Sequence, residues 1–219
     1  MSIANERRIE ILYGAGDLVA IDRRVRAPLR FNTMPWAFPE EPDLIALGER
    51  SQRLDFLREH LKSLCPLWDR LPRLFLDAYF RHTEECIAEN RAELEATADR
   101  LGGLFAPEDW SYSALCPLPR AHLSTDTDFS MDFAFWTGET LCAVAITGTE
   151  TPNRARRESL RRLRESGIAV IEIAGTDLPH DGMRALSAQL PAPFHEFWKT
   201  ERLPSSPFRI GALDEILQA

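Results

Sequence analysis

The chain has 219 residues, and its composition, 44% hydrophobic and 27% charged, is that of an ordinary globular protein. The formal net charge of −8 excludes a general binder of polyanions, so any contact with nucleic acid needs a local basic patch. No window carries the roughly 18 apolar residues of a membrane span, and the first residues lack the apolar stretch of a secretory signal. A cytoplasmic protein without a membrane partner is therefore expected.

The N-terminal part of the chain predicts a hairpin followed by an extended connector. Two short apolar runs, residues 9–13 and 18–21, flank Gly14-Ala15-Gly16-Asp17, and this pattern favours a β-hairpin, or a strand and a turn. Residues 27–42 carry four prolines, which favour an extended segment whose aromatic side chains, Phe31, Trp36 and Phe38, pack onto the body of the protein.

Two amphipathic helices are predicted next. Leucines recur at intervals of three, four and seven residues and form one stripe, which predicts a helix capped by Asp43 and ended by Pro66. The leucine stripe consists of Leu47, Leu54, Leu57, Leu61 and Leu64. A second helix is predicted from about Arg73 to Leu101, with Pro72 where its first residue would be and Gly102-Gly103 as its stop. The short link between them favours an antiparallel helical hairpin.

The cysteines and histidines predict no metal site. The four cysteines, Cys65, Cys86, Cys116 and Cys142, form no Cys-x-x-Cys pair, and most lie among apolar residues, as small core side chains do. His82 and Cys86 would share one helical face, but their spacing offers no cluster of four ligands. No cofactor is therefore predicted for the main interpretation.

The C-terminal half changes to an α/β pattern. Residues 104–124 are proline-rich and predict a loop. The elements expected after it are a strand over 128–136, a strand over 140–147, a helix over 152–166, a strand over 168–173 and short tail helices from Leu178. This order predicts an α/β fold with a mixed sheet and a crossover helix. It divides the chain into two parts, residues 1–120 and residues 121–219. The alternative is that both parts belong to one continuous domain.

A family resemblance appears in three segments of this half. Asp132-Phe133-Ala134-Phe135, Val144 to Gly148, and Arg154 to Ile173 together resemble the core of the PD-(D/E)XK nucleases, and most of all relatives of very-short-patch-repair endonucleases. The resemblance covers about residues 124–175. It implies a restriction-endonuclease-like fold, in which an aspartate on one hairpin strand faces a Glu-x-Lys triplet on the next. It also implies Mg²⁺-dependent phosphodiester hydrolysis, with at least two carboxylates holding the ion.

Two catalytic positions of that core are empty in this sequence. Asp132 takes the place of the metal-binding aspartate. A two-residue turn at Gly138-Glu139 would place Asp132 opposite Ala145, so that Ala145 and Thr147 stand where the family keeps its acid and its lysine. Alanine offers no ligand atom, and one carboxylate alone holds Mg²⁺ weakly. The departure affects the chemistry and leaves the fold intact.

The acidic residues leave two interpretations open. Asp132 is either a relic of a metal site or an ordinary strand residue that caps a helix or pairs with an arginine. If the chain is active, Glu150 after the second strand and Glu158 on the helix are the candidates for a relocated acid.

Four arginines form one stripe on the predicted helix. Arg154, Arg157, Arg161 and Arg164 are spaced by three, four and three residues, so they share a face. Such a stripe could hold DNA phosphates, or it could pair with acids of this chain or of a partner.

The sequence therefore predicts a non-catalytic nuclease-like protein that acts as a binding or assembly subunit. We expect a protein partner that contacts the helical hairpin. A second copy of the chain, forming a homo-oligomer, is the other candidate partner. One alternative is a divergent Mg²⁺-dependent DNA nuclease with a relocated acid. The other is a DNA-binding module that uses the arginine stripe.

Overall fold

The computed structural model describes residues 7–36, 50–123, 129–148, 154–199, 204 and 206–207. Six strands form one mixed sheet in the order β2-β1-β3-β4-β5-β6, which confirms an α/β fold. The strands are β1 (Arg8–Tyr13), β2 (Asp17–Asp22), β3 (Leu118–Leu123), β4 (Phe129–Trp136), β5 (Leu141–Thr147) and β6 (Ala169–Ala174). The α-helices are α1 (Arg50–Ser63), α2 (Arg70–Glu89), α3 (Arg91–Arg100), α4 (Arg154–Glu165) and α5 (Leu178–Gln189). Two 3₁₀ helices, Pro107–Ser113 and Ala192–Phe194, complete the described elements.

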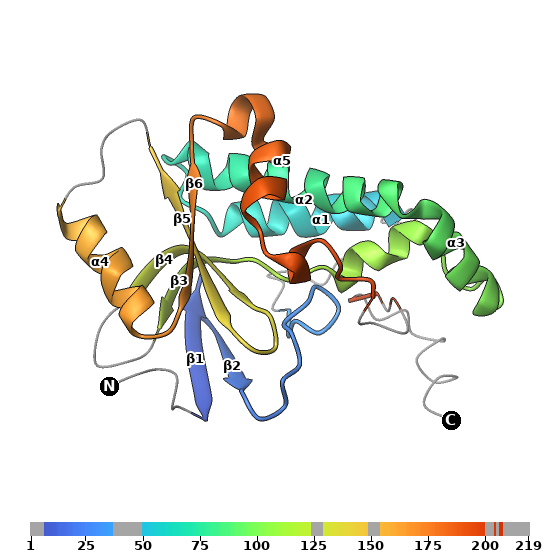
Figure 1. Cartoon of the computed structure of the whole chain (residues 1–219), viewed down its shortest axis with the longest axis horizontal. Coiled ribbons are helices and arrows are strands. Elements are labelled where there is room, and N and C mark those ends of the chain that lie inside the picture. The colour runs from blue at the N-terminus through green and yellow to red at the C-terminus, as the bar shows by residue number, and fades with distance from the viewer. Residues whose placement is uncertain are drawn as a thin grey trace.

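Helices cover both faces of the sheet (Figure 1). The helix α4 lies on one side, and α1, α2 and α5 lie on the other. Alternation along β4 sends Phe133 toward α2, where its ring centroid is 4.5 Å from that of Phe75, and sends Asp132 toward α4. The strand β5 is buried at six of its seven residues, as expected for a strand covered on both faces.

The predicted pairing of the central hairpin is confirmed where the ladder is formed. Phe133 pairs with Val144 and Ala134 with Ala143, in the register that a turn at Gly138-Glu139 requires. Gly138 has a φ of 95°, and a Cβ there would lie 2.6 Å from a backbone oxygen, so this turn needs glycine. The next strand, β6, is parallel to β5, and α4 connects the two. The restriction-endonuclease-like topology itself stays a prediction.

The second predicted helix is in fact two. The first of the two, α2, begins at Arg70, and it is capped by the Asp69 carboxylate, which accepts a hydrogen bond from the Leu71 N–H at 3.0 Å. It ends at Glu89, and α3 begins at Arg91. The prediction of one helix was wrong because the Asn90 side chain donates to the Cys86 carbonyl at 2.8 Å, which replaces a backbone partner and interrupts the helix.

The strand β3 was missed by the sequence prediction, which placed a loop there. Pro117 and Pro119 argue against a strand by local chemistry. Hydrogen bonding to β4 nevertheless runs from Leu118 to Leu123, while β1 pairs only with His122 and Leu123. Pro119 lies beyond the two residues of β3 that pair with β1, and its carbonyl still accepts a hydrogen bond from the Gly14 N–H at 2.8 Å, so the proline ring costs β3 no ladder bond to β1.

The N-terminal hairpin is confirmed, and it extends the same sheet through the pairing of β1 with β3. Residue 120, where the N-terminal unit was predicted to end, therefore lies inside β3; the division into domains stays a prediction. In the connector, Phe31 is buried and stacks with Trp36 at 6.3 Å between ring centroids. Phe38 lies outside the described residues.

The predicted helical hairpin is present as α1 packed against α2 (Figure 1). Leu57 and Leu61 of the leucine stripe are buried, and the Lys62 ammonium lies 2.6 Å from an Asp77 carboxylate oxygen across the helix pair. Asp43, the predicted cap, lies outside the described residues. All four cysteines are free and buried, as predicted. Within the described part of the chain, no helix is long and apolar enough to cross a membrane.

Candidate functional site

Asp132 lies where the β4–β5 ladder ends. The backbone pairing runs as far as Phe133 and Val144, and beyond it the Asp132 Oδ2 accepts a hydrogen bond from the Ile146 N–H at 2.6 Å. The side chain, 27% exposed, thus supplies the acceptor that this backbone group needs. Part of its hydrogen-bonding capacity is used by its own sheet.

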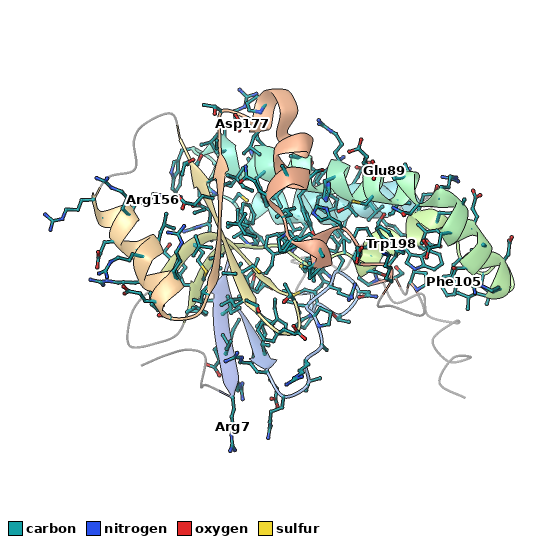
Figure 2. The ribbon with its side chains drawn as sticks, viewed as in Figure 1. Arg7, Glu89, Phe105, Arg156, Asp177 and Trp198 are labelled. Carbon is teal, nitrogen blue, oxygen red and sulfur yellow. The ribbon has the colours of Figure 1, made fainter. Side chains whose placement is uncertain are left out.

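Arg156 completes this cluster from α4. Its Nη2 donates to Asp132 Oδ2 at 2.6 Å and to the Ile146 carbonyl at 3.0 Å. Figure 2 shows Arg156 near the start of α4, beside the sheet. The three groups close a network in which a charge-assisted bond joins the helix to two strands. Asp132 thus pairs with an arginine, and its interpretation as a relic of a metal site stays a prediction.

A cavity of about 280 Å³ lies between α4 and the strands β4 and β5. Among the described residues that line it, Asp132 is the only carboxylate, and the methyl groups of Ala143 and Ala145 face it. The Thr147 hydroxyl, on the neighbouring strand position, donates a hydrogen bond to the Ile173 carbonyl at 3.2 Å. These residues do not fit Mg²⁺, which needs more oxygen ligands than one arginine-bonded carboxylate supplies.

The two candidates for a relocated acid differ in what the structure describes. Glu150 lies outside the described residues. Glu158 does not line the cavity; it accepts hydrogen bonds from Arg161 at 2.6 Å and from Arg162 at 3.2 Å on the outer side of α4. The hydrogen bond from Arg161, followed by that from Arg162, lowers the pKa of Glu158. The Glu158 carboxylate is thus a member of a surface ion-pair network.

The arginine stripe is half paired with acids of this chain. Arg161 contacts Glu165 as well as Glu158, and Arg164 contacts Glu172 on β6. In the part of the chain that the structure describes, Arg154 and Arg157 are exposed and pair with no acid. The positive charge available to a phosphate backbone is therefore smaller than four arginines suggest.

A second polar cluster lies on the opposite side of the sheet, between α2 and the C-terminal segment. His82 Nε2 is 3.0 Å from His195 Nδ1 and 3.6 Å from the Cys86 sulfur. Burial, followed by the charge of His195, lowers the pKa of His82 to about 4, and burial raises the pKa of the Cys86 thiol to about 11. Sequence spacing flagged His82 with Cys86, but it could not place His195, because that residue is 113 positions away from His82.

The two clusters differ in what they can do. The Asp132 cluster can hold a helix against the end of a hairpin, and it offers one carboxylate to any ligand. The His82 cluster brings imidazole and thiol groups to one point. Known proteins provide no guide to either, since no family model, no curated protein and no solved structure matches this chain.

Proposed function

We propose that this protein is a non-catalytic, nuclease-like binding or assembly subunit. The observation that carries the proposal is the state of Asp132, the residue that takes the place of the metal-binding aspartate. Its Oδ2 accepts two hydrogen bonds of 2.6 Å, one from a guanidinium and one from a backbone N–H. A cation that took this oxygen would have to displace Arg156, which also bonds Ile146.

The neighbours of Asp132 support the same conclusion. Phosphodiester hydrolysis by this mechanism needs two carboxylates around the ion and a polarised water. Ala145 presents a methyl group where the second carboxylate would stand, and the Thr147 hydroxyl is already bonded to β6. The arginine therefore serves as a fixed counter-charge in place of a removable ion.

Titration with Mg²⁺ and Mn²⁺ tests the absence of the nuclease site. We expect isothermal titration calorimetry to give the same weak heats for the wild type and Asp132→Asn, and we expect neither protein to cleave duplex DNA in Mn²⁺. Asp22→Asn is the matched control, because Asp22 is also paired with an arginine, but at the surface. Saturable binding and cleavage that disappear in Asp132→Asn and persist in Asp22→Asn would restore the divergent nuclease.

The link between α1 and α2 supports the binding half of the proposal. Leu67 and Trp68 are adjacent there, and their side chains are 79% and 86% exposed. Two large apolar neighbours in water are unusual for a surface link, and tryptophan is the residue type that most often dominates a protein interface. The helical hairpin thus presents an apolar tip that a pocket on a protein partner could cover.

Trp68→Ala tests this tip. We expect the variant to fold with the stability of the wild type within about 0.5 kcal/mol, because its side chain is exposed. Binding to the partner recovered from the native source should weaken by about 30-fold or more, the loss that a central aromatic residue causes. Leu104→Ala is the control, since Leu104 is 75% exposed beyond the end of α3. A protein that stays monomeric by light scattering and recruits nothing would contradict the proposal.

A further inference from the structure

We propose that His82, Cys86 and His195 form a binding site for a zinc ion. The sequence alone predicts no metal site, and this inference is independent of the proposed function, which rests on Asp132 and on the link between α1 and α2. His82 and Cys86 are one helical turn apart on α2, so their side chains leave the same face. His195, at the end of the 3₁₀ helix Ala192–Phe194, approaches from the C-terminal segment.

Two of the three distances between the ligand atoms lie within about 0.3 Å of those in a tetrahedral zinc site. With Zn–N bonds of about 2.0–2.1 Å and a Zn–S bond of about 2.3 Å, two nitrogens stand about 3.3 Å apart and a nitrogen and a sulfur about 3.6 Å apart. The structure has 3.0 Å between His82 Nε2 and His195 Nδ1, and 3.6 Å between His82 Nε2 and Cys86 Sγ. One ligand atom from each of the three residues lies within 4.8 Å of the others.

The nitrogens that would not bind the ion are held by hydrogen bonds. His195 Nε2 is 2.7 Å from the Leu190 carbonyl, so this nitrogen carries the proton and leaves the Nδ1 lone pair for a ligand bond. His82 Nδ1 is 3.2 Å from the Ser187 hydroxyl, which can accept a hydrogen bond from a protonated Nδ1 and so leave the Nε2 lone pair for the metal. Such outer contacts orient the histidines of metal sites.

The surroundings suit a cation with one open position. A cavity of about 330 Å³ adjoins the cluster, and Glu85, Glu89 and Glu196 line it. Figure 2 shows Glu89 on α2 and Trp198 on the C-terminal segment, two residues that border this cavity. Lys199 also lines the cavity and lies 2.9 Å from Glu196, so Glu85 and Glu89 provide the remaining negative charge that attracts a divalent ion. The fourth ligand would be a water molecule in the cavity.

A hydrogen bond between the two imidazoles is the alternative explanation of the 3.0 Å contact. It requires His82 Nε2 to carry a proton that points at His195 Nδ1, and it gives Cys86 no role. The two explanations differ in whether the sulfur becomes a thiolate ligand, so the sulfur is the atom to follow in an experiment.

Cobalt titration of the full chain shows whether the Cys86 sulfur binds the metal as a thiolate. The reduced protein is stripped of metal by a chelator and titrated with Co²⁺ under absorption spectroscopy, and zinc is then added in competition with a chromophoric chelator. We expect one Co²⁺ per chain, the visible bands of a tetrahedral ion, and a thiolate-to-cobalt charge-transfer band in the near ultraviolet, all of them abolished by one equivalent of Zn²⁺.

Four variants assign the ligands. Cys86→Ala should lose the charge-transfer band, and His195→Ala should lower the zinc affinity by at least about tenfold. Ser187→Ala, which removes only the partner of His82 Nδ1, should lower it by about tenfold. Cys65→Ala is the control, since Cys65 is equally buried and lies outside the cluster. Near-ultraviolet circular dichroism establishes that each variant is folded, and if Cys86→Ala is not, the affinity of His195→Ala decides.

Three results would overturn the site. They are the absence of a charge-transfer band in the wild type, its persistence in Cys86→Ala, and a zinc affinity that His195→Ala leaves unchanged. The imidazole hydrogen bond would then account for the cluster. A confirmed site would instead mean that a metal ion clamps the segment around His195 to α2, and that its binding raises the melting temperature of the wild type and not of His195→Ala.

Discussion

Phe75→Ala is expected to lower the free energy of unfolding of the whole chain by about 3–5 kcal/mol. Phe75 is fully buried on α2, and its ring centroid lies 4.5 Å from that of Phe133 and 6.4 Å from that of Phe135, both on β4. Truncation removes one of the apolar contacts between the helical hairpin and the sheet, beside that of Tyr79 with Phe135, and leaves a cavity between them. Because this contact joins the two halves of the chain, both should lose stability together.

Urea unfolding followed by circular dichroism measures the loss, and hydrogen exchange locates it. We expect a lower midpoint with an unchanged slope, and a fall in protection in both α2 and β4. Leu67→Ala is the control, because Leu67 is 79% exposed and its truncation should cost less than about 0.5 kcal/mol. Loss of protection in α2 alone would mean that the two halves unfold separately.

Asp132→Ala is expected to destabilise the protein by about 1–3 kcal/mol, the cost of leaving a buried hydrogen-bonding group without its partner. The group concerned is the Ile146 N–H, which donates to the carboxylate at 2.6 Å. Asp132→Asn should cost less, since an amide oxygen can still accept this bond. A carboxylate kept for metal binding would behave in the opposite way, because its removal relieves an uncompensated charge and often stabilises an enzyme.

A double-mutant cycle with Arg156→Ala separates the ion pair from the backbone bond. We expect a coupling energy near 1 kcal/mol, because the two side chains are 27% and 39% exposed and water screens their attraction. Thermal or urea unfolding of the four proteins gives the value. Additivity within about 0.3 kcal/mol would show that Arg156 is no partner of Asp132 in solution.

Much of the candidate site could be predicted from local patterns, and its decisive contact could not. The alternation of β4 and the turn at Gly138-Glu139 were enough to predict the register of Ala134 with Ala143. The helix after the hairpin was predicted from its arginines and leucines. The choice of Arg156 as the partner of Asp132 was missed, because the angle at which a helix packs on a sheet decides which arginine reaches a strand residue 24 positions earlier.

The sequence by itself determined the strands of both hairpins, the helices α1 and α4 and the lack of a second acid opposite Asp132, because side-chain period and turn chemistry act between near neighbours. Only the tertiary structure decided that Pro119 belongs to a strand and that His195 meets His82. Each of these depends on a surface supplied by a distant segment, β4 in the first case and α2 in the second. Contacts of that kind form only when distant segments pack together, and the spacing of residues along the chain does not predict them.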